Sequence, residues 1–184
     1  MDGALYAFRR AVDGDPLNAR SWVKQGSVLS DMDCRTPAAE CFRAAEALDA
    51  NDSNLYLHRG QLHVLANEHS AAVKDLRRST ELCPSVAGAW AAWGVALFKR
   101  ASSSPGQVSP MSESLKVMED ALRQFPESPE VLLFFSEILT QLGDFSRALG
   151  LLRRAAAAEP QSPLPFVNAA RAYLGMNDLI SARR

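Results

Sequence analysis

Three histidines and three cysteines are the residues of this chain best suited to catalysis or metal binding. His58, His63 and His69 are separated by five and then six residues, so successive imidazoles point to different faces of a helix or lie beyond its end. We therefore expect neither a zinc site nor any other cofactor.

The cysteines show no Cys-x-x-Cys spacing, and their odd number indicates free thiols in a reducing compartment. Cys34 and Cys41 are seven residues apart across an expected helix corner, and we interpret them as buried, inert thiols. The sequence also contains no nucleophile elbow, Walker loop or Gly-x-Gly-x-x-Gly run. These absences predict a binding protein and not an enzyme.

Composition narrows the kinds of partner. The 184 residues are 47% apolar and 22% charged, which is typical of a folded protein and not of a disordered one. A net charge of -1 gives no general attraction for nucleic acid or anionic lipid, so no nucleic-acid partner is expected. No apolar run approaches the roughly 18 residues of a membrane span, and the first residues lack a secretory signal. The chain as given is expected to face the cytosol.

A repeat is the strongest feature of the sequence. Gly26, Gly60 and Gly94 are spaced by 34 residues and again by 34, which is the period of the tetratricopeptide repeat (TPR). An aromatic residue precedes each glycine by four positions: Trp22, Tyr56 and Trp90. Small residues at fixed positions allow two antiparallel helices to approach closely, while large residues fill the gaps between them. The period therefore predicts pairs of packed helices.

The predicted fold is all-α, a superhelical TPR solenoid of antiparallel helix pairs that forms a single segment over residues 1–184. Complete repeats are expected at 19–52, 53–86, 87–128 and 129–162, with partial repeats at 1–18 and 163–184. The predicted helix pairs are 19–32 with 35–48, 53–66 with 69–82, 87–101 with 111–124, and 129–142 with 145–158.

One repeat is longer than the others. From Gly94 to its counterpart Ser136 there are 42 residues, so eight have been inserted near 100–110. This stretch is rich in Ser, Pro and Gly, which predicts a lengthened loop exposed to solvent. A regulatory role through phosphorylation at Ser104 or Ser109, each followed by proline, stays open as the alternative.

The first helix of each repeat lines the concave face of a TPR stack, where such proteins bind their partners. On these helices the positions that the packing pattern does not use are unusually apolar, which favours an amphipathic or hydrophobic helix as partner. Phe98 and Phe134 are the expected anchors. The alternative is that these positions pack against a neighbouring repeat. The candidate partner-binding residues are Leu57, His58, Gln61, Val64, Leu65, Ala91, Val95, Phe98, Leu133, Phe134, Glu137, Val167, Asn168 and Arg171.

A second TPR binding mode holds the two carboxylates of a peptide that ends in Glu-Glu-Val-Asp. This clamp needs cationic and amide side chains at matched positions of three successive first helices. The matched pairs here are Arg20 with Lys24, Asn54 with His58, and Gly88 with Ala92. Because the third pair carries no side-chain donor, clamp binding is not expected.

Two longer strings are more specific than the period. They are LYLHRGQLHVL at 55–65 and FPESPEVLLFFSEILTQLGDFSRAL at 125–149. Both resemble the large TPR receptor of the mitochondrial outer-membrane translocase, closely over about residues 50–150, and the lengthened corner falls in the matching place. The resemblance is to the C-terminal, substrate-binding part of that family.

This resemblance implies a receptor on the cytosolic face of the mitochondrial outer membrane. Its implied partners are hydrophobic or internal-targeting-helix preproteins, other translocase subunits, and cytosolic chaperones bound by a separate clamp domain. The membrane anchor and clamp domain of that family have no counterpart in this sequence. A TPR chaperone adaptor and a structural scaffold subunit of a large complex stay open as alternative functions.

Overall fold

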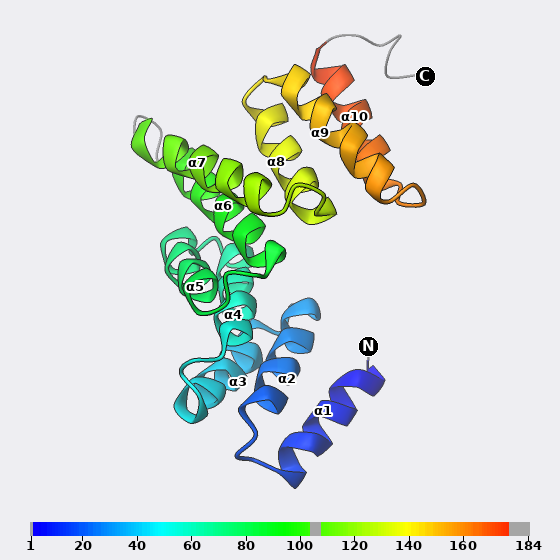
Figure 1. The fold of residues 1–184 in the computed structure, drawn as a ribbon. Helices are drawn as coiled ribbons and strands as arrows, with labels where there is room; N and C mark the ends of the chain where they lie inside the picture. The colour runs from blue at the N-terminus through cyan, green and yellow to red at the C-terminus, as the bar shows by residue number, and fades with distance from the viewer. Residues whose placement is uncertain (1, 104–107, 177–184) are drawn as a thin grey trace. The chain divides into compact units, whose positions relative to one another are not determined.

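The computed structural model describes residues 2–103 and 108–176, and all regular structure in them is helical (Figure 1). The helices are α1 (Asp2–Gly14), α2 (Ala19–Asp31), α3 (Arg35–Leu48), α4 (Ser53–Leu65), α5 (His69–Leu82), α6 (Ala87–Ser102), α7 (Val108–Gln124), α8 (Pro129–Gln141), α9 (Phe145–Ala158) and α10 (Leu164–Gly175). The all-helical fold predicted from the repeat is confirmed.

The helix bounds follow the predicted pairs closely, with one difference at the insertion. A loop was expected near 100–110, but α6 continues through Ser102 and α7 already begins at Val108. Pro110 lies in the first turn of α7, where proline is tolerated because the first amides of a helix have no partner within it. Ser104, one of the two expected modification sites, lies outside the described residues, and Ser109 lies within α7.

Three of the corners within helix pairs share one backbone device. Asp33, Asn67 and Gly143 have positive φ angles of 57°, 59° and 81°. Beyond each of them an amide bonds back to the preceding helix, as in Cys34 N to Leu29 O at 2.8 Å. This is the left-handed helix ending for which Gly, Asn and Asp are suited. It turns the chain sharply and sends the second helix back along the first.

The chain divides into two compact units, Met1–Ser85 with α1 to α5 (unit 1) and Val86–Arg184 with α6 to α10 (unit 2). Helices pair in sequence order within each unit, α2 with α3, α4 with α5, α6 with α7 and α8 with α9. The first helices of successive pairs also pack together, α2 against α4 in unit 1, and α6 against α8 and α8 against α10 in unit 2. These adjacent first helices are the elements expected to hold the binding site.

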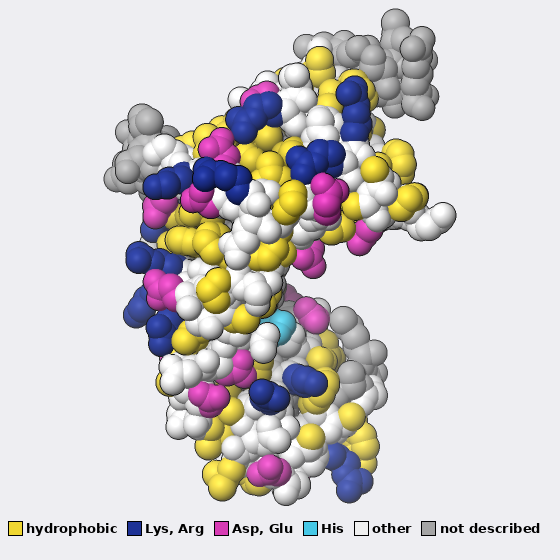
Figure 2. All heavy atoms as spheres, in the orientation of Figure 1, with side chains coloured by type: hydrophobic (Ala, Val, Ile, Leu, Met, Phe, Trp, Pro, Cys, Tyr) yellow, Lys and Arg dark blue, Asp and Glu magenta, His cyan; other side chains and the backbone are white. Residues whose placement is uncertain are grey.

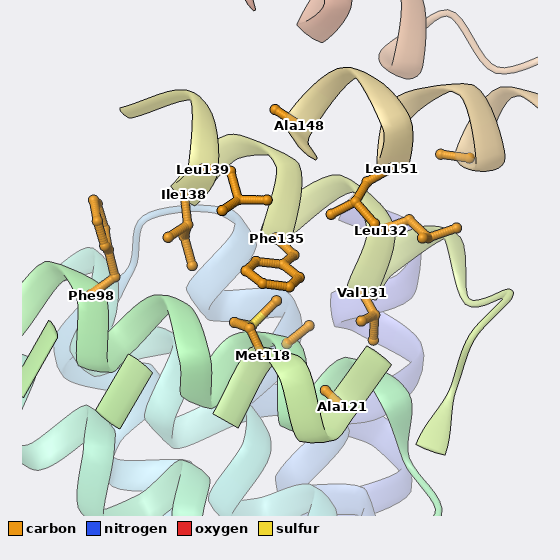
Figure 3. Packing of buried hydrophobic residues seen from close by; sticks show 12 residues of the cluster. Phe98, Met118, Ala121, Val131, Leu132, Phe135, Ile138, Leu139, Ala148 and Leu151 are labelled. Carbon is orange, nitrogen blue, oxygen red and sulfur yellow. The ribbon is translucent and has the colours of Figure 1, made fainter. Parts of the chain in front are cut away.

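The periodic glycines mark the tightest helix contacts. A Cβ atom on Gly26 would come within 2.7 Å of the Phe42 ring, and the same atom on Gly94 would overlap the Met118 side chain. In the next repeat the first helix contributes Phe135, which points toward Met118 in the buried cluster of unit 2 (Figure 3). Small residues therefore leave room for large ones from the paired helix, as the sequence pattern predicted.

Candidate functional site

The fourteen candidate residues lie on the first helices, and they fall in both units. In unit 1 they are on α4: Leu57, His58, Gln61, Val64 and Leu65. In unit 2 they are on α6, α8 and α10: Ala91, Val95, Phe98, Leu133, Phe134, Glu137, Val167, Asn168 and Arg171. Each set is described within its own unit.

In unit 1 the candidate surface of α4 is partly polar. Leu57 and Val64 are half-buried, whereas Leu65 is 54% exposed. His58 Nδ1 lies 3.4 Å from the Ser27 hydroxyl of α2 and 3.3 Å from the Gln61 Oε1 atom. Burial lowers the pKa of His58, so its imidazole is neutral near pH 7. His58 therefore acts here as a hydrogen-bonding group and not as a charge.

A hollow of about 210 Å³ lies between α2 and α4. Two cationic side chains line it together with a carboxylate, so its charge is mixed. Sequence reasoning did not single out the carboxylate, Asp52, whose side chain accepts from the Asn54 amide at 2.9 Å and begins α4. The position of an N-cap directly before the first helix is the signal that would have found it. The lining residues are Arg20, Val23, Lys24, Asp52, Asn54 and His58.

In unit 2 two candidate residues are not on an open surface. Ala91 is fully buried and Phe98 is only 7% exposed. Both belong to the buried cluster that also holds Ile138 and Leu139 of α8, and Figure 3 shows Phe98 on the α6 side of that cluster. The expectation that Phe98 is an exposed anchor was wrong, because α8 packs against α6 at this position.

The other apolar candidates of unit 2 are at least partly accessible. Phe134 of α8 is 41% exposed and Val167 of α10 is 54% exposed. Val95 of α6 and Leu133 of α8 are partly buried and pack against the core cluster. We call the accessible set the first-helix surface of unit 2: Val95, Leu133, Phe134, Glu137, Val167, Asn168 and Arg171.

A small polar hollow of about 50 Å³ lies in this surface between α8 and α10. We call it the Glu137 slot. Gln141 was absent from the candidate residues, although it occupies the helix position that Leu65 has in α4, so the repeat register would have found it. Its lining residues are Glu137, Thr140, Gln141, Asn168 and Arg171.

Part of the string at 55–65 has a structural role that sequence reasoning missed. Arg59 of α4 lies 2.7 Å from Asp75 of α5 and 2.6 Å from Glu46 of α3. Its guanidinium also lies 5.2 Å from the centre of the Tyr56 ring. Asp75 is only 6% exposed, so this network joins three helices around a buried carboxylate. Charges on three separate helices leave no periodic signal in a sequence.

The remaining reactive groups are arranged as structural residues. Cys34, Cys41 and Cys83 are free thiols, and burial raises the pKa of Cys41, which keeps it protonated. Over residues 2–103 and 108–176, no group of His, Cys, Asp and Glu side chains is arranged to hold a metal ion. Within the same ranges, no helix combines the length and apolar character needed to span a bilayer. On the face shown in Figure 2, Lys and Arg side chains are interspersed with Asp and Glu.

Comparison with known proteins assigns the helix pairs to a fold. The family model for the tetratricopeptide repeat matches residues 111–164. The solved structure of TTC0263, a TPR protein of Thermus thermophilus, superposes with a TM-score of 0.80 at 18% identity, over 89% of this chain and 86% of that one. The chain has the TPR fold. TPR helix pairs are protein-interaction scaffolds, so the coarse function is protein binding.

The TPR segment is also similar in sequence to import receptors. It is 26% identical over 152 residues to the mitochondrial import receptor subunit TOM70 of Homo sapiens, covering 83% of this chain and 25% of that protein. The corresponding subunit of Saccharomyces cerevisiae is 29% identical over 147 residues, covering 80% and 22%. The structure of yeast Tom70 superposes with a TM-score of 0.63 at 21% identity, over 98% of this chain and 46% of that one. The chain thus spans about a quarter of the length of the receptor subunits that it matches.

Proposed function

We propose that this protein is a receptor that binds hydrophobic or amphipathic helical segments of preproteins for import into mitochondria, and that the first-helix surface of unit 2 is the binding site. The observation that carries this proposal is the exposure of Phe134, at 41%, on the central helix of three packed first helices. Large aromatics on such surfaces tend to dominate binding.

The gain from covering this surface is modest. Removing the exposed part of one phenylalanine from water contributes about 2 kcal/mol, and Val167 beside it adds about 1 kcal/mol. Association also costs translational and rotational freedom, so a few such contacts give weak, reversible binding. Weak binding is what a receptor needs when it must release each precursor.

The cellular setting in this proposal comes from the sequence similarity to mitochondrial import receptor subunits. It places the protein at the cytosolic face of the mitochondrial outer membrane, with other translocase subunits and cytosolic chaperones as partners. A chaperone adaptor would instead bind charged tail peptides, and a scaffold subunit would hold one partner permanently. Peptide binding distinguishes these functions.

We would titrate a labelled presequence peptide, an internal-targeting peptide and an EEVD peptide against the 184-residue chain. Phe134→Ala should weaken binding of the targeting peptides more than tenfold, since truncating a central aromatic costs about 2 kcal/mol or more. Phe166→Ala is the matched control, because Phe166 is 58% exposed on α10 but lines a different hollow with Leu149 and Tyr173. Circular dichroism checks that both variants stay folded.

Equal effects of the two substitutions would contradict the assignment of the site. Tight binding of the EEVD peptide would contradict the receptor function and favour the chaperone adaptor.

A further inference from the structure

The Glu137 slot combines a carboxylate with several oxygen acceptors beside an apolar anchor. Neither Glu137 nor Arg171 makes a hydrogen bond or ion pair with another described residue. The Glu137 carboxylate is half-buried, whereas Arg171 is exposed. The charge held within the slot is therefore the negative one.

Hydrogen bonding makes the slot richer still in acceptors. The Thr140 hydroxyl donates to the Ser136 carbonyl oxygen at 2.8 Å, so its own oxygen can only accept from a partner. The side-chain amides of Gln141 and Asn168 each add a carbonyl oxygen. A volume of about 50 Å³ holds roughly three water-sized groups, which is room for an ammonium or guanidinium group.

The slot lies next to the proposed anchor. Glu137 follows Phe134 by three residues, which is about one turn of α8 and about 4.5 Å along its axis. On a docked helix, a side chain three or four residues from the one that covers Phe134 would reach this position.

We propose that the Glu137 slot binds a lysine or arginine of the docked segment, so that the receptor selects apolar segments with a basic residue one helical turn from the anchoring residue. This selectivity rests on the proposed function, because it needs Phe134 to be the anchor. Glu137 would then determine specificity, while Phe134 supplies the apolar contact.

The test uses synthetic helical peptides of about four turns with leucines on one face. One pair carries a single lysine one turn before or one turn after the central leucine, and matched peptides carry glutamine or glutamate there. We expect the better lysine peptide to bind the 184-residue chain about five- to tenfold more tightly than its glutamine match. Glu137→Gln should abolish that preference and leave the affinity for the glutamine peptide unchanged.

Glu159→Gln is the charge-matched control, because Glu159 is exposed at the end of α9, and the lysine preference should survive in it. Equal binding of the lysine and glutamine peptides to the wild type would overturn the inference while leaving the proposed function intact. Preference for the glutamate peptide would also overturn it and assign the slot to Arg171. Failure of every peptide to bind would instead count against the proposed function itself.

Discussion

Gly60 of α4 lies directly against Leu76 of α5, so close that a Cβ atom at Gly60 would come within 2.6 Å of the Leu76 Cγ atom. Leu76 is fully buried. The distance between these two helices is therefore set by the absence of a side chain at one position.

The first prediction concerns that contact. Gly60→Ala should lower the free energy of unfolding by about 1–3 kcal/mol, because the added methyl group overpacks the helix pair. Gly150→Ala is the control, since Gly150 lies within α9 and has no atom within 4 Å of its would-be Cβ. This second change should stabilise the chain by about 0.5–1 kcal/mol through helix propensity. Chemical denaturation measures both, and stabilisation by Gly60→Ala would contradict the observed packing.

The second prediction concerns the Arg59 network. Arg59→Met should cost about 3 kcal/mol of unfolding free energy, because it leaves the buried Asp75 carboxylate without its guanidinium partner. The matched control is Arg77→Met, which removes an exposed arginine paired with Glu81 and should cost less than about 1 kcal/mol. Similar losses in the two variants would show that the network contributes no more than a surface pair.

The third prediction is a pH dependence. Hydrogen bonds from Arg59 hold the pKa of Glu46 below its ordinary value. Because the folded pKa is the lower one, the stabilisation is complete above the unfolded value of about 4.3 and is lost as the pH falls through the folded value. Between about pH 6 and about pH 3, the wild type should therefore lose more unfolding free energy than Glu46→Gln. Parallel curves for the two proteins would contradict this account.

The fourth prediction separates the two phenylalanines that the sequence analysis grouped as anchors. Phe98→Ala should cost about 3–5 kcal/mol of unfolding free energy, because Phe98 is 7% exposed in the core of unit 2. Phe134→Ala should cost far less stability and act on peptide binding instead. A larger loss of stability for Phe134→Ala would reverse this assignment.

The sequence predicted most of the helix bounds, because the helix contacts repeat. Gly26, Gly60 and Gly94 face Phe42, Leu76 and Met118, so one contact recurs with the period of the sequence. The start of α7 was predicted less well. The proline and serines near 110 resemble a loop in composition, but a first helical turn tolerates them equally well.

Which residues of the candidate site are accessible could not be predicted from the period. The register gives the helix face on which a side chain lies, but not whether a neighbouring helix covers it. Phe98 and Phe134 were both expected on the concave face, yet α8 covers Phe98 and leaves Phe134 accessible. The Arg59 network was equally invisible, because its partners are 13 and 16 residues away on other helices.

Site-specific photocrosslinking tests the central claim, that a preprotein segment docks on the first-helix surface of unit 2. A photoreactive phenylalanine analogue would replace Phe134 in one variant and Phe166 in another, both exposed phenylalanines of unit 2. The account predicts that an internal-targeting peptide crosslinks to position 134, that unlabelled peptide competes with this reaction, and that position 166 stays unmodified. Crosslinking at position 166 that equals or exceeds that at position 134 would contradict it.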